Sequence, residues 1–181
     1  MGGSFNPAHQ GHLAMTLHAL RRLQLDQVWW LVSPQNPLKP EKGMASLVAR
    51  MSGARNMTRH PRILVTDIED QLGTRYTVDT LKQLKRRFPH TNFIWLMGAD
   101  NLKQLPRWKK WQEIFALVPV AVFRRPNYAA GRGLGKVARR FSRNWRSARN
   151  AKNLAQQQTP VWLILDNQLN ILSATSIRQQ R

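Results

Sequence analysis

Short apolar runs of strand length recur along this chain, and segments with the spacing of amphipathic helices lie between them. The predicted strands are 28–32, 62–68, 93–97, 118–123 and 162–165. A continuous apolar run such as FIWLM is typical of a strand that is covered on both faces, as in a parallel sheet. The alternation therefore predicts the α/β class, and specifically a Rossmann-like three-layer αβα domain with a mostly parallel sheet.

The predicted helices have apolar residues three and four positions apart. The first contains Leu13, Leu17, Leu20 and Leu23, the second spans 45–59, and the third starts at Thr77 as its N-cap and ends at Pro89. A short helix follows Asp100, and Trp108 and Trp111 bracket a basic helical segment.

The 181 residues, of which 42% are hydrophobic, suffice for one buried core, so we expect a single domain over 1–181. No cysteine is available for a disulfide or a thiolate site. No apolar run has the length of a membrane span, and no signal-peptide pattern opens the chain. These features predict a cytoplasmic protein without a membrane partner, and no pattern specifies an oligomeric state.

The charge is strongly unbalanced, with 29 Lys and Arg against 9 Asp and Glu and a formal net charge of +20. Such an excess favours polyanionic partners and predicts nonspecific nucleic-acid binding. Ten of the cations lie in 124–152, where there is no acidic residue. We expect an exposed basic helix there, followed by a flexible stretch; a nucleic-acid surface is the alternative.

Residues 2–12, GGSFNPAHQGH, have the composition of a tight turn that leads into a helix. Glycines allow a ligand to approach the backbone closely, and the first turn of a helix has unpaired N–H groups. The segment therefore predicts an anion site such as one for phosphate.

His9 and His12 lie three positions apart at that helix start. Imidazole N–H groups placed there would donate hydrogen bonds to phosphate oxygens whose charge increases during a transfer reaction. Two alternatives remain open at this stage. The histidines are a cap and its neighbour on an ordinary helix, or they are metal ligands at i and i+3.

Further candidates occur where a predicted strand or loop meets a helix. Lys39 lies in the proline-rich loop 33–42, Tyr76 and Thr77 precede a helix, and Asp100 follows Gly98 at the end of a strand, where a carboxylate is placed to bind ribose or to cap the helix. In 173–178, Ser173, Thr175 and Arg178 gather at another helix start, which is either a second anion site or a simple cap.

Taken together, GGSFNPAHQGH, Lys39, Tyr76-Thr77, GADN at 98–101, Trp108 and SATSIR at 173–178 resemble bacterial nicotinate-mononucleotide adenylyltransferase. The resemblance covers nearly the whole chain. The first and last motifs are those of the wider HxGH nucleotidyltransferase superfamily, and the middle ones point to the nicotinate branch. It implies adenylyl transfer from ATP to nicotinate mononucleotide in NAD biosynthesis, giving nicotinate adenine dinucleotide and pyrophosphate.

The resemblance also implies a role for each candidate. The residues that would bind ATP are Gly3, Ser4, Phe5, Gly98, Asp100, Ser173 and Thr175, with His9, His12, Lys39 and Arg178 on the phosphates as the catalytic set. Tyr76, Thr77 and Trp108 would form the nicotinate pocket, with the tryptophan stacked on the pyridine ring. Mg²⁺ would be held mainly by ATP phosphates and water, so no protein metal site is predicted.

Two alternatives stay beside this one: another HxGH enzyme, such as a pantetheine-phosphate adenylyltransferase or a cytidylyltransferase, and a basic nucleic-acid-binding module. One departure from the family pattern is that its glycine turn follows a strand of about five apolar residues, which is missing before Gly2. Without that strand, backbone groups of the neighbouring strand lose their partners, so we expect low stability or activity of this chain.

Overall fold

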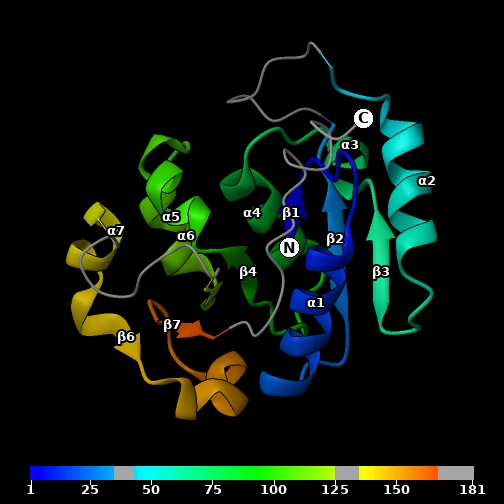
Figure 1. The fold of residues 1–181 in the computed structure, drawn as a ribbon. Coiled ribbons are helices and arrows are strands. Elements are labelled where there is room, and N and C mark those ends of the chain that lie inside the picture. The colour runs from blue at the N-terminus through cyan, green and yellow to red at the C-terminus, as the bar shows by residue number, and fades with distance from the viewer. Residues whose placement is uncertain (35–42, 125–134, 167–181) are drawn as a thin grey trace. The chain divides into compact units, whose positions relative to one another are not determined.

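The computed structural model describes residues 1–34, 43–124 and 135–166 (Figure 1). The chain forms two compact units, one containing Met1–Arg75 and the other Tyr76–Gln168. Lys39, Ser173, Thr175 and Arg178 lie outside the described residues.

The first unit has three parallel strands in the order β1-β2-β3, with β1 at Gly2–Gly3, β2 at Val28–Val32 and β3 at Ile63–Thr66. Its helices are α1 (Gln10–Arg22), α2 (Leu47–Met57) and the short α3 (Ile68–Gln71). The central strand β2 buries four of its five residues, which explains why its sequence is a continuous apolar run.

The first residues of the chain pair with β2, although the strand of about five apolar residues is missing before Gly2. Gly2–Gly3 form the two-residue strand β1, in which Gly2 is paired with Leu31 and Gly3 with Val32. The amino group of Met1 is buried and donates a hydrogen bond to the carbonyl oxygen of Trp29 at 2.9 Å. Burial lowers the pKa of this amino group from 8.0 to about 5, against the opposing charge of Glu69.

The second unit has four parallel strands in the order β4-β5-β7-β6. Its elements are α4 (Thr77–Arg87), β4 (Trp95–Gly98), α5 (Asp100–Gln104), η1 (Leu105–Arg107), α6 (Trp111–Leu117), β5 (Val120–Phe123), α7 (Gly135–Arg140), η2 (Ser142–Asn144), β6 (Trp145–Arg146), η3 (Ala148–Gln156) and β7 (Trp162–Leu165). Every residue of the interior strand β5 is buried. The predicted α/β fold with parallel strands and intervening helices is confirmed.

Three local predictions are wrong. Tyr76, not Thr77, is the N-cap of α4, because the carbonyl oxygen of Tyr76 accepts from the N–H groups of Asp79 and Thr80. The chain between Trp108 and Trp111 is not helical, since Lys110 has left-handed backbone angles and α6 begins after it.

Among the described residues, no helix is both long enough and apolar enough to span a membrane.

The third wrong prediction is the single basic helix followed by a flexible stretch. Residues 135–156 instead form α7, η2, β6 and η3 in succession. This segment is anchored by buried apolar side chains, Val137 and Phe141 first and then Ala151 and Leu154. The spacing of these anchors changes from four to three, which favours a change from α-helix to 3-10 helix.

Candidate active site

The turn and helix start at residues 2–12 are held together by the two histidines. His9 is the N-cap of α1, and the N–H of Gly11 donates to its Nδ1 at 3.1 Å. The N–H of His9 in turn donates to Nδ1 of His12 at 3.2 Å. This is the reciprocal arrangement of a capping box, with imidazoles in place of the usual hydroxyl and carboxylate.

The capping contacts determine which ring nitrogen of each histidine carries the proton. Nδ1 of both rings accepts a hydrogen bond, so in the neutral imidazole the proton lies on Nε2. Each ring is then a donor through Nε2, and the ring centroids are 3.8 Å apart. This pair suits the oxygens of a phosphate, and it disfavours the metal-ligand alternative, which requires an unprotonated nitrogen facing the ion.

Buried aromatic side chains pack beneath the backbone of the turn, within the first unit. Phe5 is 2% exposed and has a left-handed φ of 46°, and its ring stacks on Trp30 with centroids 5.1 Å apart. Thr16 fixes this packing, since its hydroxyl accepts from Nε1 of Trp30 and donates to the carbonyl oxygen of His12. A Cβ added at Gly3 would lie 3.3 Å from the Phe5 ring, so the turn is closely packed at its second glycine.

Arg50 of α2 is buried and connects the turn to two other loops. Its Nη1 donates to the carbonyl oxygens of Ser4 at 2.8 Å and Ser33 at 2.7 Å, its Nη2 to that of Pro34 at 2.9 Å, and its Nε to that of Ala45 at 2.9 Å. Burial lowers the pKa of this guanidinium, but the four carbonyl dipoles solvate its charge. Sequence reasoning missed Arg50, although it lies three positions after Leu47 and four before Ala54, on the face expected to be buried.

Asn6 fixes the other side of the turn. Its Nδ2 donates to the carbonyl oxygen of Gly43 at 3.1 Å, and its Oδ1 accepts from the N–H of Ala45 at 3.3 Å. The turn is therefore bonded to the chain before α2 through both ends of one amide side chain. Sequence reasoning assigned Asn6 only to turn composition; no pattern in the sequence indicates its partners.

In the second unit, Gly98 and Asp100 lie where predicted, at the carboxyl end of β4. Gly98 is the last, buried residue of the strand, and Asp100 is the first residue of α5. The N–H of Ala99 donates to the carbonyl oxygen of Phe123 at the end of β5, so the two strands end together. The carboxyl edge of a parallel sheet is where open α/β folds bind ligands.

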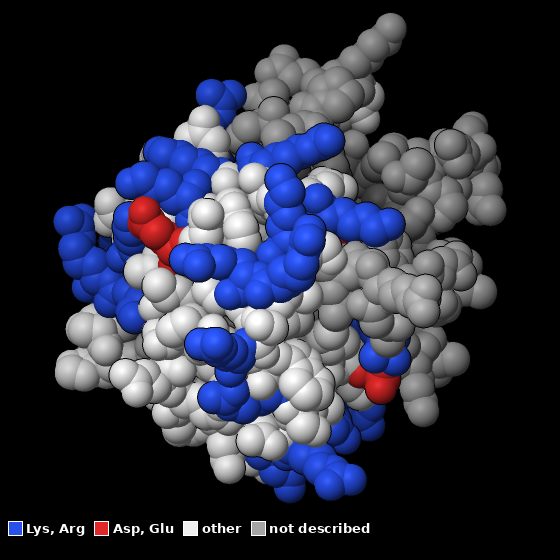
Figure 2. Space-filling view, turned by 90° about the vertical axis from the view of Figure 1, so that its left-hand side faces the viewer, with Lys and Arg blue, Asp and Glu red and all other residues white. Residues whose placement is uncertain are grey.

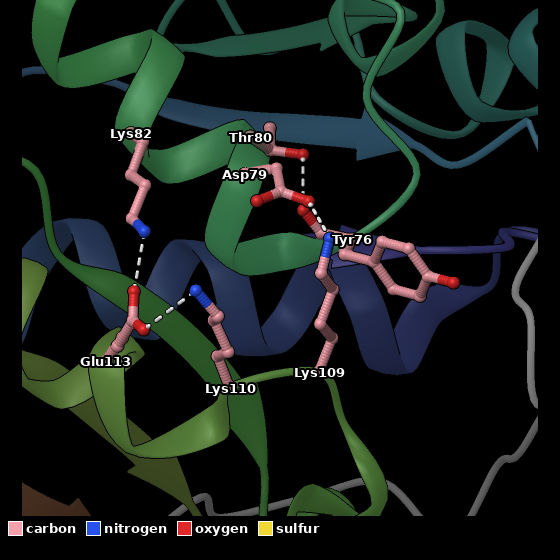
Figure 3. A network of polar contacts seen from close by, with 7 residues as sticks. All are labelled: Tyr76, Asp79, Thr80, Lys82, Lys109, Lys110 and Glu113. Carbon is pink, nitrogen blue, oxygen red and sulfur yellow. Dashed lines mark hydrogen bonds and ion pairs between the residues drawn. The ribbon is translucent and has the colours of Figure 1, made fainter.

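Tyr76 and the loop after Trp108 lie against each other in the second unit (Figure 3). Nζ of Lys109 is 4.6 Å from the centroid of the Tyr76 ring and 3.0 Å from Oδ2 of Asp79. Thr77 and Trp108 are both partly exposed beside these two residues in sequence. The structure thus joins Tyr76 to the residue that follows Trp108, through a lysine and an aspartate that sequence reasoning missed.

A second group of ion pairs links α4 to α6 and to the residue before α6. Lys82 of α4 lies 2.6 Å from one carboxylate oxygen of Glu113 in α6, and Lys110 lies 3.5 Å from the other (Figure 3). The hydrogen bond from Lys82, with the charge of both lysines, holds the pKa of Glu113 below its ordinary value. Through Glu113, these exposed contacts link Lys110 to α4.

The predicted residues that the structure describes are Gly3, Ser4, Phe5, His9 and His12 in the first unit, and Tyr76, Thr77, Gly98, Asp100 and Trp108 in the second. Among the described residues, no three His, Asp or Glu side chains come together as a metal site.

The chain is similar to known proteins over nearly its whole length. The family model described as cytidylyltransferase-like matches residues 1–180. A probable nicotinate-nucleotide adenylyltransferase of Parvibaculum lavamentivorans is 52% identical over 99% of this chain and 90% of that protein. A protein of the same name from Gluconobacter oxydans is 48% identical over 99% of this chain and 92% of its own length.

Solved structures show the same fold. The Plasmodium falciparum nicotinic acid mononucleotide adenylyltransferase complexed with NaAD aligns with a TM-score of 0.74 over 98% of this chain and 80% of that chain, at 14% identity. Fold, motifs and sequence identity over almost the full length all agree, and this chain belongs to the nicotinate-nucleotide adenylyltransferases, a group of enzymes within the cytidylyltransferase-like family.

Proposed function

We propose that this chain transfers the adenylyl group of ATP to nicotinate mononucleotide, forming nicotinate adenine dinucleotide and pyrophosphate in NAD biosynthesis. The names of its relatives support this reaction. The observation that carries the proposal is the histidine capping box, which places two Nε2–H donors at the start of a helix that follows a glycine turn.

The reaction is a single in-line displacement. A phosphate oxygen of the mononucleotide forms a bond to the α-phosphorus of ATP as the bond from that phosphorus to the β-phosphate oxygen breaks. Charge increases on the leaving pyrophosphate, so preorganised donors lower the barrier. His9 and His12 are proposed as those donors, with His12 acting in the transition state.

The remaining nucleotide contacts follow the positions of the predicted residues. We propose that Gly3, Ser4 and Phe5 contribute backbone contacts, and that Asp100, next to Gly98 at the carboxyl edge of β4, binds the adenosine ribose. Lys39 and Arg178 are proposed to bind the triphosphate. Ser173 and Thr175 would form the helix start that precedes Arg178.

On the acceptor side, Tyr76, Thr77 and Trp108 are proposed to bind nicotinate mononucleotide. The start of α4 carries unpaired backbone N–H groups and the positive end of the helix dipole, a combination that suits the nicotinate carboxylate. Trp108 is partly exposed, and we propose that its indole ring stacks on the pyridine.

Mg²⁺ is the proposed cofactor. It would neutralise charge on the ATP phosphates, which supply its ligands together with water. The donor character of the two histidines fits this division, because protonated Nε2 atoms bind phosphate oxygens and not the ion. We further propose a cytoplasmic location, and nonspecific nucleic-acid binding through the basic surface, which a net charge of +20 favours.

The test is pyrophosphate release from ATP and Mg²⁺ with three separate acceptors: nicotinate mononucleotide, nicotinamide mononucleotide and phosphopantetheine. Turnover with the nicotinate acceptor supports the proposal, and identification of nicotinate adenine dinucleotide by mass spectrometry completes it. Turnover with phosphopantetheine alone would assign the chain to a sister activity, and absence of turnover with all three would contradict the proposal.

A further inference from the structure

Seven cationic side chains follow one another in the second unit without an acidic residue among them, and all of them are exposed: Lys136, Arg139, Arg140, Arg143, Arg146, Arg149 and Lys152. We call these seven together with Trp145 the basic track. Figure 2 shows that Lys and Arg cover much of the face that carries α7 and β6, with few acidic side chains between them.

In the last part of the track, the spacing of the cations matches the 3-10 helix η3. From Arg140 to Lys152, a cation occurs at every third position. A 3-10 helix has three residues per turn, so side chains at i and i+3 lie in one row, about 6 Å apart along the axis. In η3, Arg149 and Lys152 form such an exposed row, and Ala151 and Leu154 form the buried one.

These charges do not serve the fold through ion pairs. In the ranges that the structure describes, none of the seven is paired with a carboxylate. Arg146 donates from Nη1 to the carbonyl oxygens of Arg143 and Trp145, and its other N–H groups are not used in that contact. Clustered cations repel one another, so a bound polyanion would stabilise the track.

Trp145 adds a second, independent observation. It lies in β6, the edge strand of the sheet, and is 48% exposed. Arg143 lies two positions before it in sequence, and Arg146 follows it directly. An exposed indole between guanidinium groups is a surface on which an unpaired base stacks while phosphates meet the cations.

We propose that the basic track binds single-stranded nucleic acid, with its phosphates along the row of cations and a base stacked on Trp145. A duplex keeps its bases stacked inside, so it offers phosphates to the track but no base to the tryptophan. An anionic membrane would call for several exposed apolar side chains, whereas the track has one. The proposal does not depend on the transferase reaction.

The experiment measures fluorescence anisotropy of a labelled oligouridylate of about 15 nucleotides, over a range of salt concentrations, with the full chain. The test variant replaces Arg143, Arg146 and Arg149 by Gln. The matched control removes the same charge from exposed positions elsewhere, at Arg55, Arg86 and Arg87. We expect the test variant to reduce the slope of log K against log salt by about two, and the control to leave most of the affinity.

Trp145→Ala separates stacking from charge. Because its side chain is exposed, the variant should fold with an unchanged circular-dichroism spectrum, keep its transferase turnover, and bind the oligouridylate about tenfold more weakly. Trp145→Phe should recover most of that loss. A duplex of equal length should bind wild type and Trp145→Ala with the same affinity.

Three outcomes would overturn the proposal. Equal losses in the arginine test variant and its control would show that affinity follows net charge and not the track. Unchanged oligouridylate binding in Trp145→Ala would show that no base stacks on Trp145. Absence of RNA binding, together with binding to phosphatidylserine-containing vesicles that depends on Arg143, Arg146 and Arg149, would make the track a membrane surface.

Discussion

Nη1 of Arg50 donates a hydrogen bond to the carbonyl oxygen of Ser4 at 2.8 Å, joining residues 46 positions apart in sequence. The same nitrogen bonds the carbonyl oxygen of Ser33, directly after β2. One buried cation thereby holds the glycine turn and the end of a strand in a single arrangement. The turn that carries His9 and His12 is positioned by tertiary contacts as well as by its own composition.

Replacement of Arg50 by Lys should destabilise the chain and weaken the transferase. A lysine ammonium cannot reach four carbonyl groups that a planar fork reaches, so buried acceptors lose their donors. We expect a loss of about 3 kcal/mol in the free energy of unfolding, measured by urea denaturation. Arg55→Lys, on an exposed position of the same helix, is the control; equal midpoints for both variants would contradict the role assigned to Arg50.

The histidine capping box allows a structural role to be separated from a catalytic one. Glutamine at position 12 and asparagine at position 9 retain an oxygen that accepts the backbone N–H but lose the imidazole Nε2–H. His12→Gln and His9→Asn should therefore keep thermal stability close to wild type, and turnover should fall about 10²–10³-fold for each. His90→Gln serves as the control. A turnover loss that tracks a loss of stability would show that the histidines act only as caps.

The buried amino group of Met1 predicts a dependence of stability on pH. Its pKa is about 5 in the folded chain and 8.0 as the ordinary value, so between these pH values the unfolded chain binds a proton that the folded chain excludes. Stability therefore rises with pH through this window and levels off above about pH 8. From pH 6 to pH 8 this group should add about 2 kcal/mol to the free energy of unfolding.

Urea denaturation at the two pH values measures this effect, with the chain acetylated at Met1 as control. The acetylated amide still has one N–H to donate to the carbonyl oxygen of Trp29, but it is uncharged at both pH values. If both forms gain equally between pH 6 and pH 8, the amino group is not the cause.

Lys109 is expected to affect binding of the acceptor more than stability. It is partly exposed, so loss of its ion pair to Asp79 should cost less than about 1 kcal/mol of folding free energy. Lys109→Met also removes the cation above the Tyr76 ring, and we expect KM for nicotinate mononucleotide to rise about threefold to fivefold at unchanged kcat. Lys110→Met, whose partner is Glu113, should leave KM unchanged; an equal rise in both variants would argue against a specific role of Lys109.

The periodicity of the sequence predicted β2, β3, β4, β5, β7 and most helices, because apolar runs and helical spacing reflect burial that every α/β domain requires. The two-residue strands β1 and β6 are too short to leave such a pattern. Residues 28–32 and 162–165 were predicted to the residue. The secondary structure of the basic segment was not predicted correctly. Its buried residues Val137, Phe141, Ala151 and Leu154 are few among many cations, and their spacing changes from four to three along the segment.

The amino-acid sequence by itself determined the fold class, the family and the identity of the candidate residues. It did so because apolar periodicity and short motifs, such as the glycines and histidines at the start of the chain, depend on residues that lie close together in sequence. Only the tertiary structure decided how those residues are held. The capping contacts place the proton of each neutral imidazole on Nε2. Arg50 bonds the turn at Ser4, 46 positions away in sequence, and Lys109 of the loop after Trp108 contacts the ring of Tyr76. Such contacts join groups distant in sequence, and no local pattern records which carbonyl or ring a buried cation will meet once the chain has folded.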